Sequence, residues 1–259
     1  MKYFFEDVYG NAIEKDLYIN SEAEKKLSDK GVLKEDILVK WIYSNEKRLN
    51  DVCRYFIIDG NIVPCDGKDF ILSKYSDVKI EGKYKSVVLI LESPHKDEYT
   101  GYSMQENSFC PIAPANGKTG FAIEKYKNSS KNAEYYSLRE LIMNFTDIKK
   151  EKYAVILCNP VQYQTSLGSF TGKFYRDLRD DMWKSMYPYF EKDFIKRIKS
   201  YNPELIINAC TGKNKEGELK KYVSESLIKE KYRHIMTPHP FSWIFGGIKK
   251  SSVDLTYYD

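Results

Sequence analysis

The sequence predicts an α/β protein with three layers, in which helices cover both faces of a central, mostly parallel sheet of four to five strands. Two observations lead to this prediction. Short apolar runs rich in β-branched residues recur along the chain, and stretches with helical periodicity separate them. The runs lie at residues 87–91, 154–157, 205–207 and 234–236. This alternation is typical of a doubly wound sheet.

Residues 1–80 differ in pattern from the rest of the chain and predict an N-terminal α+β elaboration. Ser21 can cap a helix that Gly31 ends, and residues 33–41 have the pattern of a second amphipathic helix. A β-hairpin is expected over residues 54–63, because two β-rich arms flank the turn Asp59-Gly60. The hairpin is expected to pack on the main sheet. The α/β domain itself is expected over residues 81–259.

The segments between the four predicted strands are expected to be helices and one long loop. Residues 99–131 hold several glycines and prolines, which predicts an irregular loop with a functional role. Ser137 begins a predicted helix, and residues 216–229 form another. Residues 175–199 predict a longer helix that is broken near Pro188, because proline removes a helical hydrogen bond.

Composition limits the classes of protein and ligand. The chain has 259 residues and a formal net charge of +4, with 41 Lys and Arg against 37 Asp and Glu, so a nucleic-acid surface requires local clustering of charge. Its five cysteines form no Cys-x-x-Cys pair, which argues against a zinc ribbon or an iron–sulfur cluster. No metal and no other cofactor is expected. Without a leader or a long apolar span, the chain is expected to be cytoplasmic, monomeric and not bound to a membrane.

Three polar residues come directly after predicted strands. Glu92 follows the first strand, Asn159 the second, and His239 the last. Ligands of open α/β sheets bind beyond the carboxyl ends of the strands, so these side chains are expected to converge. Two of them have a structural alternative: Glu92 can cap a backbone amide and Asn159 can begin a turn. His234 lies inside the last strand and is expected to be a core residue.

The motifs at these strand ends carry a resemblance to a known family. They read Leu-Glu-Ser-Pro-His at 91–95, Leu-Cys-Asn-Pro at 157–160, Ala-Cys-Thr-Gly at 209–212 and His-Pro at 239–240. In order and spacing this series resembles the uracil-DNA glycosylase superfamily, and it is most similar to the Glu-Ala-Pro branch, without the iron–sulfur cysteines of that branch. The resemblance covers about residues 85–245.

The resemblance implies an enzyme that hydrolyses the N-glycosidic bond of a flipped uracil or modified base in DNA and leaves an abasic site. It implies that Glu92 stabilises the sugar cation or orients water, that Asn159 binds the base edge, and that His239 donates to a keto oxygen of the base. DNA, single- or double-stranded, is the expected partner. Further residues are expected to contact the substrate: Ser93, Pro94, His95, Phe109, Asn116, Phe121, Phe241 and Trp243. The DNA phosphates are expected to contact three lysines, Lys118, Lys213 and Lys249.

The motifs also depart from those of the family. Leu91 stands where the family has Gly, Phe241 where it has Ser, and Ala115 lies near the place of the Phe that stacks on the base. A smaller residue there predicts a roomier pocket and a bulky modified base, such as those of phage DNA, with roles in repair or phage defence. Two other functions stay open: a non-catalytic nucleic-acid or nucleotide-binding module on the same fold, and a hydrolase that acts on small nucleotides.

Overall fold

The structure is a computed structural model of the chain, and the described residues are 2–7, 9–16, 48–64, 84–95, 98–103, 108–111, 114–148, 150–165, 173–212 and 218–256. The chain divides into two compact units. One comprises residues 1–49, 93–112 and 161–190, and the other comprises residues 50–92, 113–160 and 191–259. The helices expected at 21–31 and 33–41 lie outside the described residues.

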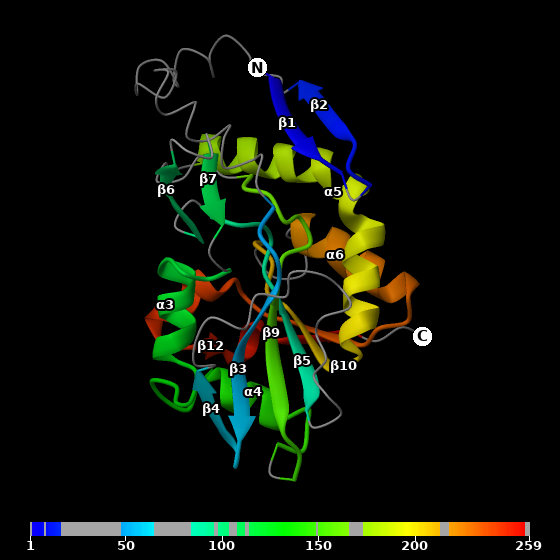
Figure 1. The fold of residues 1–259 in the computed structure, drawn as a ribbon. Coiled ribbons are helices and arrows are strands. Elements are labelled where there is room, and N and C mark those ends of the chain that lie inside the picture. The colour runs from blue at the N-terminus through cyan, green and yellow to red at the C-terminus, as the bar shows by residue number, and fades with distance from the viewer. Residues whose placement is uncertain are drawn as a thin grey trace. The chain divides into compact units, whose positions relative to one another are not determined.

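A seven-stranded sheet forms the centre of the second unit, in the order β13-β11-β10-β5-β9-β3-β4. Figure 1 labels β10, β5, β9, β3 and β4 of this sheet. Its four inner strands are the four predicted runs, and they are parallel to one another. They are β5 (Lys85–Ile90), β9 (Tyr153–Cys158), β10 (Pro203–Asn208) and β11 (His234–Met236). The predicted α/β class with a mostly parallel central sheet is therefore confirmed.

The sheet is wider than the four to five strands expected, because antiparallel strands extend both of its sides. On one side β13 (Asp254–Thr256) pairs with β11. On the other, β3 (Val52–Ile58) pairs with β9 and with β4 (Asn61–Pro64). The predicted hairpin thus exists, and its turn residues Asp59 and Gly60 both have positive φ, 50° and 73°. It belongs to the sheet itself, where we expected an element packed on it.

Helices lie against both faces of this sheet. Alternate residues such as Val87, Leu89 and Val155 belong to a core cluster with the helices α3 (Lys118–Lys125) and α4 (Leu138–Met143). The residues that alternate with these along the strands face α5 (Lys173–Tyr201) and α6 (Glu218–Lys229). Ser86 Oγ, for example, donates to the Tyr201 carbonyl at 2.6 Å. Successive side chains of a strand point to opposite faces of the sheet. Both faces are therefore covered by helices, and the unit has three layers.

Two of these helices begin as their local sequence requires. Ser137 caps α4 in a capping box, in which its hydroxyl accepts from the Glu140 N–H and the Glu140 carboxylate accepts from the Ser137 N–H. In α3, a Cβ on Gly120 would lie 1.5 Å from the Ala115 carbonyl oxygen, so only glycine fits there. Ala115 itself has a φ of 58°.

The region 99–131 is more regular than we expected. It contains a hairpin of β6 (Tyr99–Ser103) and β7 (Ser108–Pro111), followed by the helix α3. The prediction of an irregular loop was wrong because glycine and proline also occur at the ends of short elements and, like Gly120, inside them.

The long helix α5 continues through Pro188. The predicted break is therefore wrong. Residues on both sides of the proline, among them Tyr187 and Phe190, are buried. Their burial stabilises the helical conformation although Pro188 cannot donate a backbone hydrogen bond.

The first unit also contains a hairpin that sequence patterns did not predict. Its strands are β1 (Lys2–Glu6) and β2 (Ala12–Asp16), which pair antiparallel. Phe5 is buried there and contacts the rings of Tyr163, Tyr189 and Phe190 at centroid distances of 5.5–6.2 Å.

Short elements complete the second unit. β8 (Tyr135–Tyr136) pairs antiparallel with β12 (Ile248–Lys249). Two 3₁₀ helices, η4 (Pro240–Phe245) and η5 (Lys250–Ser252), flank β12 in sequence. η4 begins at Pro240 of the His-Pro motif and packs against α3.

Candidate functional site

The carboxyl ends of the four parallel strands lie along one edge of the sheet, and backbone hydrogen bonds join each end to its neighbour. Because parallel strands run in one direction, the residues that come after them emerge at the same edge. The bonds run from Leu91 N to Cys158 O (2.9 Å), from Ala209 N to Ile90 O (2.9 Å) and from Thr237 N to Asn208 O (3.0 Å).

Glu92, Asn159 and His239 all follow strands at this edge. β5, which precedes Glu92, is the direct neighbour of β9, which precedes Asn159. β11, which leads to His239, is separated from β5 by β10 alone. With about 4.8 Å between neighbouring strands, the chain segments that carry the three residues leave the sheet within about 14 Å.

Glu92 is nearly buried, with 7% of its surface exposed, and its Oε2 accepts a hydrogen bond from Thr211 N at 3.2 Å. This bond joins the end of β5 to the loop after β10. Glu92 thus caps a backbone amide, as the structural alternative for this residue predicted. Burial, together with the nearby Glu92 carboxylate, raises the pKa of the Cys210 thiol. The thiol therefore stays protonated, and it donates to the Leu91 carbonyl.

Asn159 is completely buried, and neither its Oδ1 nor its Nδ2 has a hydrogen-bond partner. Asn208, the last residue of β10, is equally buried but fully bonded. Its Nδ2 donates to the Lys220 carbonyl at 3.0 Å, and its Oδ1 accepts from Cys210 N at 3.2 Å. The unpaired amide of Asn159 is therefore a property of that position and not of buried asparagines in this sheet.

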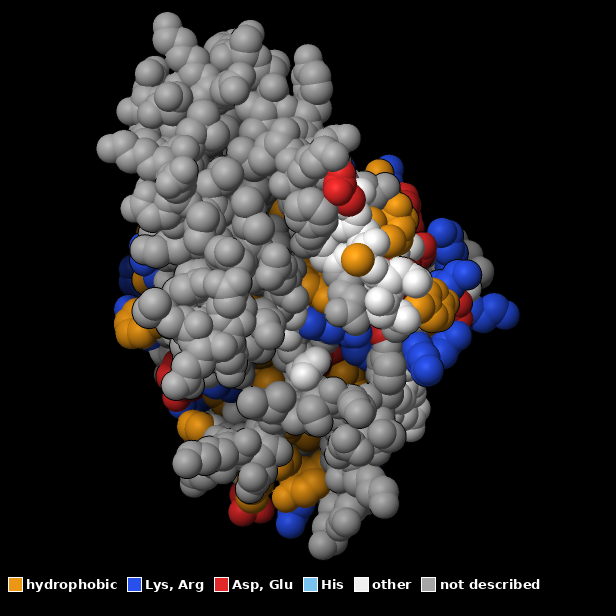
Figure 2. All heavy atoms as spheres, turned by 45° about the horizontal axis from the view of Figure 1, so that its top comes forward, with side chains coloured by type: hydrophobic (Ala, Val, Ile, Leu, Met, Phe, Trp, Pro, Cys, Tyr) orange, Lys and Arg blue, Asp and Glu red, His pale blue; other side chains and the backbone are white. Residues whose placement is uncertain are grey.

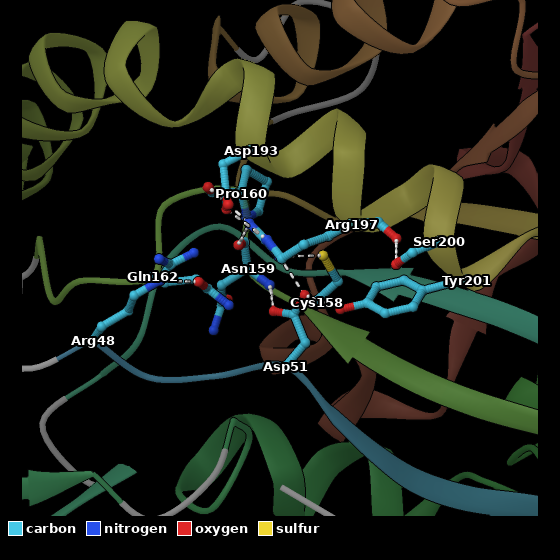
Figure 3. A network of polar contacts seen from close by, with 10 residues as sticks. All are labelled: Arg48, Asp51, Cys158, Asn159, Pro160, Gln162, Asp193, Arg197, Ser200 and Tyr201. Atoms are coloured by element: carbon cyan, nitrogen blue, oxygen red, sulfur yellow. Dashed lines mark hydrogen bonds and ion pairs between the residues drawn. The ribbon is translucent and has the colours of Figure 1, made fainter. Parts of the chain in front are cut away.

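A buried ion-pair network that sequence patterns did not predict surrounds the end of β9 (Figure 3). Arg197 of α5 forms ion pairs with Asp51, which precedes β3, and with Asp193, one helical turn earlier. Their side chains are 1–4% exposed. Asp51 and Arg197 are separated by 146 residues, and each is an ordinary charged residue in its own segment, so no local signal indicates the pair.

His239 is fixed by its own turn. Its Nδ1 accepts a hydrogen bond from Phe241 N at 3.2 Å, and its carbonyl accepts from Ser242 Oγ at 2.7 Å. Because a backbone N–H can only donate, the proton of the neutral imidazole is on Nε2. In this tautomer Nε2 is the donor atom of the His239 ring.

Three predicted substrate residues belong to the first unit. They are Ser93, Pro94 and His95. Within that unit Ser93 Oγ lies 2.7 Å from Thr165 Oγ1, and His95 N donates to Glu98 Oε2 at 3.2 Å. Phe109 lies on β7 in the same unit, and its side chain is outside the description.

The residues predicted to line the substrate around α3 and η4 divide into exposed and buried ones. Asn116, Phe121 and Phe241 are exposed. Trp243 is completely buried in the core and donates from Nε1 to the Pro238 carbonyl at 2.9 Å. Trp243 is therefore a core residue in this structure, and its contact with a substrate stays a prediction.

Of the six large hydrophobic side chains that are exposed among the described residues, three lie on α3 and η4. They are Phe121 (60% exposed), Phe241 (48%) and Phe245 (72%). α3 packs against η4, and we refer to these three exposed rings together as the phenylalanine surface.

The predicted phosphate contacts Lys118 and Lys249 are exposed, at the start of α3 and in β12, whereas Lys213 lies outside the described residues. In the view of Figure 2 the visible Lys and Arg side chains gather mainly at one side, with Asp and Glu among them. This view thus presents no continuous basic face among the described residues. Nor do these residues contain a group of three His, Cys, Asp or Glu placed to hold a metal ion, or a helix able to cross a membrane.

The fold defines an α/β protein in which the polar residues Glu92, Asn159 and His239 follow the carboxyl ends of parallel strands of one sheet. Comparison of the chain with protein-family models, with curated proteins and with solved structures gives no significant match.

Proposed function

We propose that this chain is a DNA glycosylase, which hydrolyses the N-glycosidic bond of a flipped uracil or modified base and leaves an abasic site. The observation that carries the proposal is the buried, unpaired carboxamide of Asn159, at the same sheet edge as Glu92 and the segment of His239. The motif series that resembles the uracil-DNA glycosylase superfamily supplies the same three residues.

The unpaired amide favours a ligand with a donor and an acceptor side by side. A buried polar group without a partner costs about 1–3 kcal/mol, so Asn159 destabilises the free protein unless something binds it. A carboxamide offers one acceptor and one donor, which match the hydrogen-bonding edge of a nucleobase. Base binding would thus satisfy both atoms of the side chain.

Breaking an N-glycosidic bond places positive charge on the sugar and negative charge on the departing base. In this proposal the Glu92 carboxylate stabilises the sugar cation or orients the attacking water. The Nε2–H of His239 donates to a keto oxygen of the base and stabilises its negative charge. The hydrogen bond from Thr211 N holds the Glu92 carboxylate in place for this role.

The phenylalanine surface suits the extrusion of a base from the DNA stack. Enzymes that flip a base pay a few kcal/mol for unstacking and often insert an apolar side chain into the gap. Phe241 follows the His-Pro motif and is half exposed, which makes it the proposed wedge. Lys118 and Lys249, both exposed, are the proposed contacts to phosphates.

The test is base release from oligonucleotides that carry uracil, hypoxanthine or modified cytosines, detected as alkali-labile sites. Glu92→Gln should lower the rate by about 10²–10⁴, because it removes the charge but keeps an oxygen for Thr211 N. Glu204→Gln is the matched control: Glu204 lies in the same sheet, on β10, where it accepts from Tyr153 Oη at 2.7 Å. Its rate should equal that of the wild type. No abasic product from any oligonucleotide, with DNA bound, would contradict the enzyme proposal.

The bond between Thr211 N and Glu92 also favours a second candidate, a non-catalytic module that binds nucleic acid or a nucleotide at the same edge. In that case Glu92 is only a structural cap. Binding of DNA that weakens steeply with salt, without base release, would support this candidate. Turnover of free nucleotides without salt-dependent DNA binding would instead indicate a small-molecule hydrolase.

A further inference from the structure

The backbone of Asn159 is bonded to side chains on both sides (Figure 3). Asp51 Oδ1 accepts from Asn159 N at 3.2 Å. Arg197 Nη2 donates to the carbonyl of Asn159 at 3.0 Å and to that of Pro160 at 3.4 Å. The peptide groups that determine the direction of the Asn159 side chain are therefore held by two residues from distant segments.

The orientation of Arg197 is itself determined by its remaining bonds. Its Nε donates to Asp193 Oδ2 at 2.8 Å, and its Nη1 donates to Asp51 Oδ2 and to Cys158 Sγ, the latter at 3.2 Å. With the two carbonyls above, all five N–H groups of the guanidinium have acceptors. Tyr201 Oη donates to Asp51 Oδ2 at 2.8 Å and so fixes the carboxylate as well.

Arg197 stays charged in the folded protein. Burial opposes the charge on Arg197, but the carboxylate of Asp51, the neighbouring Cys158 and the carboxylate of Asp193 outweigh it and raise the pKa of the guanidinium. Buried ion pairs contribute little net stability, since desolvation offsets their attraction. A network of this kind is better explained by the geometry that it imposes than by stability.

We propose that Arg197 and Asp51 are positioning residues, which set the direction of the Asn159 carboxamide for recognition of the base edge. This inference rests on the proposed glycosylase function. Recognition of a base requires the donor and acceptor to be held within about 0.5 Å and 10–20° of the productive geometry. Asn159 has no side-chain hydrogen bond to hold it there, so the direction comes from its clamped backbone.

Two variants break this clamp without removing the polar character of the network. Arg197→Lys keeps the positive charge, but an ammonium has three donors and no planar fork, so it cannot serve both carbonyls and both carboxylates. Asp51→Asn has one acceptor oxygen, which cannot serve Asn159 N and Arg197 together. Tyr201→Phe is the control, because it removes one bond to Asp51 but no bond to Asn159.

The functional readout is the ratio of release rates for 5-fluorouracil and uracil in oligonucleotides. Fluorine makes the base a better leaving group. Its release therefore depends less on hydrogen bonds from the protein than the release of uracil does. Arg197→Lys and Asp51→Asn should lower uracil release by about 10–100-fold and raise the ratio. Asn159→Ala should raise the ratio in the same way, and Tyr201→Phe should leave it unchanged. The ratio compares two substrates on one preparation, so partial unfolding does not affect it. An unchanged ratio in both clamp variants would overturn the proposal.

Hydrogen exchange provides a readout that needs no substrate. The Asn159 amide hydrogen, bonded to Asp51, should exchange faster in both clamp variants than in the wild type and in Tyr201→Phe. Equal protection in all four proteins would refute the clamp even if bases are released. Absence of release by the wild type, with faster exchange in the variants, would count against the glycosylase proposal and leave the clamp standing.

Discussion

Asn159 and Asn208 offer a matched pair of substitutions with opposite expected signs. Both side chains are completely buried, and both follow or end inner strands of the sheet. Asn159 has no side-chain hydrogen bond, whereas Asn208 bonds to the Lys220 carbonyl and to Cys210 N. Leucine has nearly the shape of asparagine and no polar atoms, so Asn→Leu isolates the contribution of the amide.

Asn159→Leu should stabilise the protein by about 1–3 kcal/mol, because it removes buried polar atoms that have no partner. Asn208→Leu should destabilise it by about 1–3 kcal/mol for each of the two groups that lose their bonds. The free energy of unfolding can be followed by tryptophan fluorescence in urea, since the chain has three Trp. In a thermal scan each kcal/mol corresponds to about 2–4 °C in Tm for a protein of this size.

Base release gives the second half of this prediction. If Asn159 binds the base edge, Asn159→Leu should lower the rate by about 10²–10³, the usual effect of losing one such group. Greater stability with lost activity would identify a position that the protein keeps for function. Equal destabilisation by the two leucine variants would refute the reasoning, because it would mean that the Asn159 amide is satisfied in the folded protein.

Three further predictions concern the fold and its buried charges. Gly120→Ala should destabilise the protein by about 1–3 kcal/mol or more in urea titrations, because its Cβ would lie 1.5 Å from the Ala115 carbonyl oxygen; an unchanged midpoint would contradict this packing. Burial lowers the pKa of Lys220 in the folded protein. Between this lowered pKa and about pH 10.5 the unfolded chain binds more protons than the folded protein does. The stability of the wild type relative to Lys220→Met should therefore rise as pH approaches 10.5. Burial likewise lowers the pKa of His234, so its contribution should be present above pH 6.5 and be lost as pH falls through the lowered pKa; His234→Gln should weaken this acid dependence, and identical pH profiles would disprove it.

Local patterns predicted the elements whose causes lie within a few residues. Asp59-Gly60 predicted the hairpin, since both positions need positive φ, and Ser137 predicted the start of a helix, which its capping box confirms. Local patterns failed where distant packing decides. Pro188 lies inside a continuous helix, and Trp243 is buried although its neighbours Phe241 and Phe245 are exposed.

By itself the sequence determined the four inner strands, their common direction and the polar residues at their ends, because apolar periodicity and turn chemistry act over short distances. Only the tertiary structure decided the order β11-β10-β5-β9, the addition of the hairpin to this sheet, and the pairing of Asp51 with Arg197 across 146 residues. The same folding leaves the Asn159 amide without a partner while it satisfies that of Asn208. Hydrogen bonding of a buried group depends on which segments of the chain pack around it. The residues next to it in the sequence do not determine which segments these are.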